Sequence, residues 1–326
     1  MATVERHWIW DRIESSSWIE RGIALLIVVA VVALAPVFGG GYQLQVLYTI
    51  FLFTTMAIGW NILSGFTGYI DFGYAGFIGI GAYATVLPIV KLGAPWYLAL
   101  ASGIVITAIL GSLIGYPALK LTGAYFAIAM LAVSVALRAA MSSQYLAPIT
   151  QGATGVSFFP PLSRAQAFYI MGSGAIVAAL LNLRIATSPY GLRLLTIRED
   201  ETLANSLGIN AVRDKMIAMA IHSGIAGFCG GMLAFNLSYI DPATVFAIEY
   251  TEYPIVMVLF GGLGTAVGPI AGGVVIGLLR EVLWGEFPTL HLAILGITIV
   301  VLILFLPEGV IEWLKERGTF PRRRWL

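Results

Sequence analysis

The sequence predicts an all-α, polytopic membrane protein with about ten transmembrane helices, and two observations carry that prediction. Hydrophobic residues make up 59% of the 326 residues and charged residues only 11%, whereas soluble domains are about a quarter charged. The charges are also segregated, because four long windows contain no Asp, Glu, Lys or Arg: 22–70, 92–119, 216–240 and 287–307. Since a helix needs roughly 20 apolar residues to cross the bilayer, each window holds at least one crossing.

The predicted spans lie, in chain order, near residues 22–38, 45–63, 68–90, 96–116, 122–141, 166–187, 213–239, 267–283 and 289–306. Residues 253–263 form a further apolar piece that is too short to cross the membrane unaided. The stretch GGLGTAVGP, from Gly261 to Pro269, separates this piece from the span that follows it. Counting it as a half-span or a short span gives about ten spans, in a range of roughly eight to ten.

Three regions follow from this assignment. Residues 1–21 carry mixed charges and three tryptophans, which suits a cytoplasmic or interfacial segment and not the short positive start of a signal peptide. A disordered tail is the alternative for that segment. Residues 22–307 form the membrane domain, with 22–38 as a retained first span, and residues 308–326 form a basic cytoplasmic tail.

The distribution of basic residues favours a cytoplasmic location for both termini. With the N-terminus inside and ten crossings, 14 of the 18 Lys and Arg residues lie on the cytoplasmic side. The four exceptions are Lys91, Arg138, Arg164 and Arg280. Because cytoplasmic loops carry an excess of Lys and Arg, this bias supports the orientation.

Composition excludes several kinds of partner and site. A formal net charge of +1, with no basic cluster before the last few residues, argues against nucleic acid as a partner. One cysteine, Cys229, and three scattered histidines exclude a multi-cysteine zinc site and a histidine metal cluster. None of the four lysines is followed by Ser or Thr, so the chain has no Walker A phosphate loop. If the protein uses ATP, another chain binds it.

The first candidate functional segment is the glycine-rich run from Asn61 to Ala84, which holds six glycines at membrane depth. Glycine lets helices pack closely and permits the broken helices that line cavities in transporters. Asp71 lies in this run, and an acid inside the membrane is by default a functional residue. The alternative is that residues 64–71 form a short cytoplasmic turn in which Asp71 is a wetted helix cap. His222, in a later apolar span, is either a hydrogen-bonded structural residue or a group that gates by protonation.

The second candidate functional segment is the cytoplasmic loop 188–212. Ser188 and Pro189 begin it as a turn, and Gly208 ends it. Between them we expect a short amphipathic helix with one apolar face, made by Leu194, Leu195, Ile197, Leu203 and Leu207. Its acidic residues disfavour the negative cytoplasmic face of the bilayer, so this helix is predicted to dock into a partner protein.

Four stretches in this order resemble a known family. They are LSGFTGYIDFGYAGFIGIGAY, TGAYFAIAMLAVSVALR followed by QGATGV, SPYGLRLLTIREDETLANSLGIN, and FGGLGTAVGPIAGGVVI followed by LFLPEGV. Over residues 45–310 the chain resembles the LivM-type permease subunits of branched-chain amino acid ABC importers. It departs from them at the glycine-rich run, where the family more usually has Ser-Phe-Gly-His and this chain has Asp71, Phe72, Gly73 and Tyr74.

The resemblance implies a transport subunit, not an enzyme, that crosses the bacterial cytoplasmic (inner) membrane several times. It implies as partners a second, LivH-type permease subunit in a heterodimer, two ABC ATPase subunits that hold ATP and Mg²⁺, a periplasmic binding protein that delivers the solute, and membrane lipid. This chain then holds no cofactor. Branched-chain or other hydrophobic amino acids are the expected solutes, although related members import urea, amides or aromatic acids. A self-sufficient channel or secondary carrier for a small polar solute such as urea or an amide is the alternative.

The resemblance also assigns roles to individual residues, with none that is catalytic or binds a metal. Coupling to the ATPases falls on Arg198, Glu199, Asp200, Glu201, Ala204, Leu207 and Gly208. The substrate pathway falls on Asn61, Ser64, Gly65, Gly68, Asp71, Phe72, Tyr74, Phe77, Tyr83, Tyr125 and Phe126. A hinge falls on Gly261, Gly262, Gly264 and Gly268.

Overall fold

The structure, a computed structural model, describes residues 41–286 and 296–297. Within these ranges it is almost entirely helical, and seven helical stretches, of which Pro242–Gly261 is interrupted, are long and apolar enough to cross a membrane. An all-α polytopic membrane protein is therefore confirmed. The predicted spans 22–38 and 289–306 and the terminal segments 1–21 and 308–326 lie outside the described residues, as does the end of the predicted domain 22–307.

The described elements are α2 (Gly41–Trp60), which continues into the π-helical turn η1 (Asn61–Gly65), then α3 (Tyr74–Leu92), α4 (Trp96–Ala118), α5 (Ala124–Ser142), α6 (Ala147–Thr150), the 3-10 turn η2 (Gly152–Thr154), β1 (Val156–Ser157), α7 (Arg164–Thr187), α8 (Pro189–Glu199), α9 (Glu201–Ser206), α10 (Ala211–Leu237), β2 (Tyr239–Ile240), α11 (Pro242–Val245), α12 (Glu249–Gly261) and α13 (Gly268–Glu286). The sheet among them is small: β1 pairs antiparallel with β2, with Val156 opposite Ile240.

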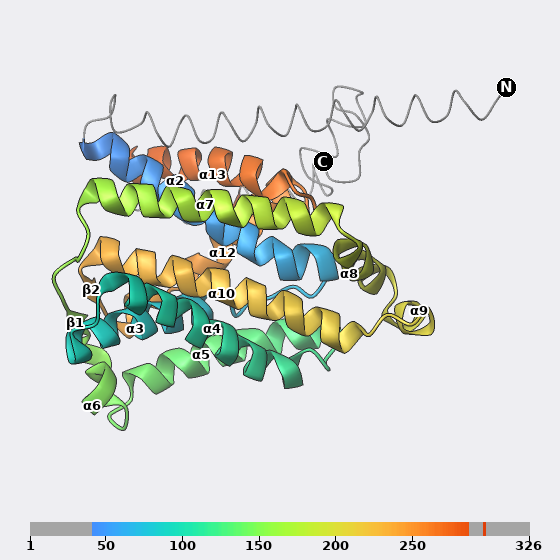
Figure 1. Cartoon of the computed structure of the whole chain (residues 1–326), viewed down its shortest axis with the longest axis horizontal. Coiled ribbons are helices and arrows are strands. Elements are labelled where there is room, and N and C mark those ends of the chain that lie inside the picture. The colour runs from blue at the N-terminus through green and yellow to red at the C-terminus, as the bar shows by residue number, and fades with distance from the viewer. Residues whose placement is uncertain (1–40, 287–295, 298–326) are drawn as a thin grey trace.

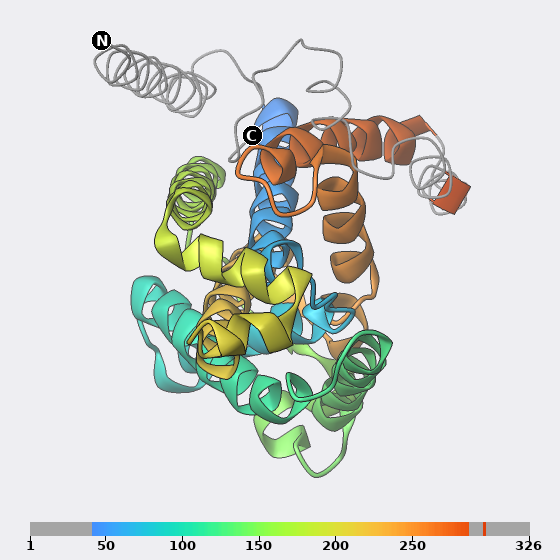
Figure 2. The same ribbon diagram turned by 90° about the vertical axis from the view of Figure 1, so that its right-hand side faces the viewer.

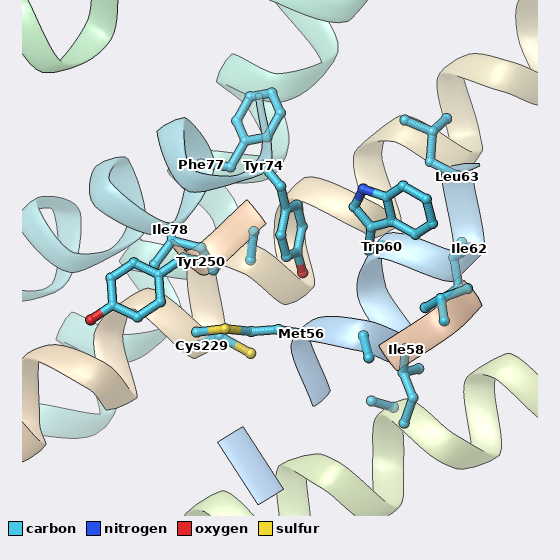
Figure 3. Close-up of a cluster of buried hydrophobic side chains, with 14 of the residues drawn as sticks. Met56, Ile58, Trp60, Ile62, Leu63, Tyr74, Phe77, Ile78, Cys229 and Tyr250 are labelled. Atoms are coloured by element: carbon cyan, nitrogen blue, oxygen red, sulfur yellow. The ribbon is translucent and has the colours of Figure 1, made fainter. Parts of the chain in front are cut away.

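The long helix α10 lies at the centre of the described fold and packs against α2, α3 and α4. Its 27 residues make it about 40 Å long. The contact with α3 is backbone to backbone, because a Cβ added to Gly81 would lie 2.5 Å from the Cα of Gly227. The predicted close packing through glycines is confirmed at this crossing. Met56, Trp60, Tyr74, Phe77 and Cys229 belong to the large core beside it (Figure 3).

The helices run between two ends of the bundle (Figure 1), and the residues at these ends differ in charge. One end, which we call the basic end, holds the connections 66–73, 119–123, 188–210 and 262–267. Lys120, Arg184, Arg193, Arg198, Arg213 and Lys215 lie at or beside these connections. The opposite end holds residues 93–95, 143–163 and 238–241, with β1, β2 and α6.

Two predicted spans differ from the helices that form. The span expected from residue 68 begins only at Tyr74, because residues 68–73 form a loop in which Gly68 has a φ of +76°. The apolar piece expected at 253–263 is α12, whose 13 residues extend about 20 Å, less than the roughly 30 Å of a bilayer core. α11 precedes it after a break at 246–248, so α11 and α12 together make one broken crossing.

Candidate functional site

The segment predicted to be a coupling helix lies across the basic end as two helices, α8 and α9, and not as one (Figure 2). α8 ends at Glu199, and Asp200 then adopts an extended backbone. The Asp200 carboxylate accepts hydrogen bonds from the backbone N–H groups of Thr202, at 2.8 Å, and Leu203, at 3.0 Å. Asp is favoured at such an N-cap, so it ends one helix and starts the next. The predicted stop at Gly208 is confirmed by its φ of +82°.

The break at Asp200 makes the prediction of one continuous apolar face wrong. Leu194 and Ile197 of α8 are buried against the membrane domain. Leu203 and Leu207, beyond the break, are instead 53% and 67% exposed. Leu203 and Leu207, with the exposed residues Glu199, Asp200 and Gly208, form what we call the α9 surface.

Arg198 fastens α8 to two other segments of the basic end. Its Nη1 donates a hydrogen bond of 3.0 Å to the carbonyl oxygen of Gly65, the last residue of η1. The same nitrogen lies close to Gly264, because a Cβ added to that glycine would be 2.9 Å from it. The methylene groups of Arg198 pack against Gly68. One guanidinium therefore contacts the end of the first described span and the connection between α12 and α13.

Glu201 fastens α9 to a buried lysine. Lys215 of α10 is 1% exposed, and its ammonium donates hydrogen bonds to Glu201 Oε1 at 2.8 Å, Tyr69 Oη at 2.9 Å and the Leu119 carbonyl at 3.1 Å. The Tyr69 hydroxyl donates to the other Glu201 oxygen at 2.6 Å. Burial raises the pKa of Glu201, but the hydrogen bonds from Lys215 and Tyr69 and the charge of Lys215 outweigh it, so the pKa lies below its ordinary value.

A third contact holds α8 directly to the start of α10. Arg193 Nε lies 2.7 Å from Asp214 Oδ2, and the Asp214 carboxylate is almost fully buried. The hydroxyl of Tyr190 donates to the Asp214 carbonyl at 2.8 Å. Since α7 runs into α8 through Ser188 alone, α8 is joined to the membrane domain both by the chain and by these side-chain contacts.

The connection between α12 and α13 is held by two buried amides. Asn61 of η1 donates to the Thr265 carbonyl at 3.0 Å and accepts from the Gly264 N–H at 2.9 Å. Asn182 of α7 donates to the Ala266 carbonyl at 2.9 Å and accepts from Asn61 at 3.2 Å. The predicted hinge glycines flank this cluster, because α12 ends at Gly261 and α13 begins at Gly268.

Asp71 lies in the loop 68–73 of the basic end, as the alternative expected, but its side chain is in the protein interior, so the wetted cap of that alternative is wrong. Its side chain is fully buried and its Oδ2 lies 2.8 Å from His222 Nε2. Its other oxygen accepts the Gly73 N–H at 2.6 Å, directly before α3. His222 is a hydrogen-bonded buried residue, as one of the two predictions for it required.

The predicted pathway residues separate into two groups. Buried in the chain's own core are Asn61, Ser64, Gly65, Asp71, Tyr74, Phe77, Tyr83 and Phe126. Exposed on its surface are Gly68, Phe72 and Tyr125. Several buried ones hold the fold together through hydrogen bonds, such as Ser64, whose hydroxyl accepts the Asp71 N–H at 3.1 Å. Their assignment to a substrate pathway stays a prediction.

A cavity of about 680 Å³ lies at the opposite end, between the first turns of α2 and α7 and the last turn of α10. Gln45, Arg164 and Asn236 give it polar groups, and Tyr48, Leu162 and Phe235 give it apolar ones. The amide of Gln45 donates to Asn236 at 3.1 Å across it. None of the predicted pathway residues lines this cavity.

The sequence did not single out the residues that bind the predicted coupling segment and the predicted hinge. Lys215, Asp214 and Tyr69 hold the coupling segment, and Asn182 holds the hinge. A signal for them existed: Asp214 and Lys215 stand at the start of an apolar span, and Asn182 interrupts another. Buried polar groups require partners, so each such residue predicts a contact, but not with which segment.

These features define a class: a multi-pass α-helical membrane protein with an exposed helical segment tied to several spans at its basic end. Residues 42–303 match the family described as branched-chain amino acid transport system / permease component. The chain belongs to this family.

Among known proteins, the chain is similar to the high-affinity branched-chain amino acid transport system permease protein LivM of Salmonella typhimurium, at 26% identity over 82% of this chain and 69% of that one. The LivM protein of Escherichia coli K12 is 25% identical over the same shares. The LivH permease protein of Salmonella typhimurium is 23% identical over 79% of this chain and 91% of its own. The predicted LivM-type resemblance is thus confirmed. No solved structure matches this chain.

Proposed function

We propose that the chain is a permease subunit of an ATP-driven importer in the bacterial inner membrane, passing branched-chain or other hydrophobic amino acids delivered by a periplasmic binding protein. One observation carries the proposal: α8 and α9 expose the α9 surface while Arg193, Arg198 and Glu201 tie them to several spans. Membership of the family and the similarity to LivM and LivH support it.

In this proposal two ATPase subunits hold ATP and Mg²⁺, and this chain holds no cofactor. A LivH-type permease is the second membrane subunit. A displacement of α9 by an ATPase is passed through Glu201 to Lys215 of α10, and through Arg198 to η1 and the connection 262–267. Because Lys215 is buried and its charge-assisted hydrogen bonds fix the geometry of its pair with Glu201, the push moves α10 as a whole and does not bend the segment.

The test is a single charge placed on the α9 surface. Leu207→Glu puts a carboxylate on a side chain that is 67% exposed, so the fold is kept. We expect the variant to be inserted normally, to lose co-purification with the ATPase subunits, and to lose uptake by at least about tenfold, the cost of burying an unpaired charge in an interface.

Phe159→Glu is the matched control, because Phe159 is 95% exposed at the opposite end. It is expected to retain the ATPase subunits. Leu207→Glu with normal ATPase binding and uptake would contradict the coupling role. Transport by this chain alone in liposomes, without ATPases, would favour a self-sufficient channel or carrier.

A further inference from the structure

A buried acid and a buried histidine join the loop 68–73 to the middle of α10, away from the contacts at the basic end. Asp71 Oδ2 lies 2.8 Å from His222 Nε2, and both side chains are fully buried. His222 stands about 16 Å along α10 from its start at Ala211. The function proposed above requires neither residue.

The hydrogen-bond partners of the two residues determine how many protons they hold. The second ring nitrogen of His222, Nδ1, lies 3.1 Å from the Gly59 carbonyl oxygen, which only accepts, so Nδ1 carries a hydrogen. The second oxygen of Asp71 accepts the Gly73 N–H at 2.6 Å. Between Oδ2 and Nε2 there is then room for one hydrogen, either on an imidazolium facing a carboxylate or on a carboxylic acid facing a neutral ring.

Removing or adding a proton breaks this arrangement. Without it, a carboxylate faces a neutral ring that has a single N–H, so the bond to Asp71 or the bond to Gly59 is lost and a buried negative charge remains. With a second proton, a carboxylic O–H points at an N–H of either His222 or Gly73, and a buried positive charge remains. The closed pair therefore holds one proton and no net charge.

Few other titratable groups face the pair in the described part of the chain. The Tyr74 ring of α3 lies 4.6 Å from the His222 ring, centroid to centroid, with Phe77 at 6.0 Å. Cys229 of α10 faces Tyr74. From α2 and η1 come the uncharged groups of Trp60, whose ring N–H donates to the Asp71 carbonyl, and Ser64. The charged residues at the start of α10, Asp214 and Lys215, are engaged two turns away with Arg193 and Glu201.

We propose that Asp71 and His222 form a buried binding site for one proton, and that His222 joins Asp71 of the loop 68–73 and Gly59 of α2 at the same time only while this proton is held. The loop also carries Tyr69, two residues before Asp71, whose hydroxyl donates to Glu201 of α9. The same hydroxyl accepts a hydrogen bond from Lys215 of α10. The loop and α10 are therefore joined twice, by Asp71 in the core and by Tyr69 at the basic end. Loss of the proton breaks one of the two His222 bonds and leaves a buried negative charge, which weakens the hold of the loop on α10 and on α9.

The experiment compares two variants by hydrogen exchange of the peptide covering residues 66–74, in the full chain with its partner subunits in lipid nanodiscs. Asp71→Asn keeps the Gly73 contact through its oxygen and donates through its nitrogen to a neutral His222, so the pair closes without a titrating proton. From mildly acidic to alkaline pH, we expect wild-type protection to fall relative to Asp71→Asn, by up to about tenfold per pH unit wherever the closed loop holds the proton and the opened loop does not.

Ser64→Ala is the matched control, because it removes a buried, uncharged contact to the same loop. It is expected to lower protection by a similar factor at every pH and to keep the wild-type slope. Equal alkaline profiles for wild type and Asp71→Asn would overturn the proposal. So would a complete loss of loop protection in Asp71→Asn at all pH values, since the pair would then need the charge and not the proton.

Discussion

Lys215 is the buried charge on which the basic end depends. Its ammonium is removed from water, and three acceptors from three segments satisfy it: Glu201, Tyr69 and the Leu119 carbonyl. A buried ion pair costs desolvation, which its mutual attraction repays when the remaining hydrogen bonds are also made, as they are here. The arrangement fixes where α9 sits more than it adds to stability.

The stabilising effect of this cluster depends on the ionisation of Glu201. Its pKa is lowered in the fold, so its contribution is fully present above the ordinary value of 4.5 and is lost as the pH falls through the lowered pKa. We expect Glu201→Gln to reduce the free energy of unfolding by about 1 to 2 kcal/mol at neutral pH, the value of a charged hydrogen bond discounted for partial exposure. This deficit should shrink below pH 4.5 in detergent-solubilised protein unfolded with denaturant.

The neighbouring Glu199 provides the comparison, because it is exposed at the end of α8. Glu199→Gln should change stability by less than about 0.5 kcal/mol at both pH values, as surface substitutions do. A deficit for Glu201→Gln that stays constant down to acid pH would show that the carboxylate acts by shape and not by charge.

At the scale of elements, the connection 262–267 has little room to change at Gly264. Gly264 has a φ of +74°, and a Cβ there would lie 2.7 Å from the Gly65 carbonyl oxygen and 2.9 Å from Arg198 Nη1. Gly208, with a φ of +82°, has open space around the same position. The two glycines therefore share the backbone strain but not the crowding.

Alanine at these two positions separates strain from crowding. Gly208→Ala should cost about 1 to 2 kcal/mol of unfolding free energy, the penalty for a left-handed backbone. Gly264→Ala should cost about 1 to 3 kcal/mol more, because η1 or Arg198 must move. Thermal unfolding of both variants measures the difference. Equal costs would mean that η1, Arg198 and the connection shift together without resistance, as expected of a free hinge.

The helices were predictable from the sequence because crossing a bilayer leaves a local signal. That signal is the long windows without charged residues that lie between connections rich in basic residues. The spans at 96–116 and 166–187 lie within two residues of α4 and α7. The break in the coupling segment was less accessible, because Asp200 reads equally as one more exposed acid on a continuous helix until its backbone is seen to be extended.

The buried pair Asp71–His222 was not predictable as a pair. Both residues were singled out in isolation, but 151 positions separate them and nothing local in the sequence indicates which residue faces which. The same holds for Asn61 and Asn182, which are 121 positions apart. Only the packing of α2, α3, α7 and α10 brings such groups together, and that packing is decided by shape over the whole bundle.

At the scale of the whole molecule, the asymmetry of basic residues predicts which end faces the cytoplasm. Among the described residues, the basic end gathers the connections around Lys120 and 188–210, whereas Lys91, Arg138 and Arg164 lie beside the connections of the opposite end and Arg280 lies within α13. Positive residues are retained on the cytoplasmic side during insertion. The basic end, with the α9 surface, is therefore expected inside, where ATPase subunits would reach it.

Cysteine labelling tests this orientation, because Cys229 is the sole cysteine of the chain and is buried. In a Cys229→Ala background, Thr122→Cys and Tyr145→Cys place one thiol at each end of α5 on exposed positions. A membrane-impermeant maleimide should label Tyr145→Cys in spheroplasts and Thr122→Cys only after permeabilisation. The reverse pattern would invert the molecule and remove the α9 surface from any ATPase, whereas labelling of both from outside would show that α5 does not cross the membrane.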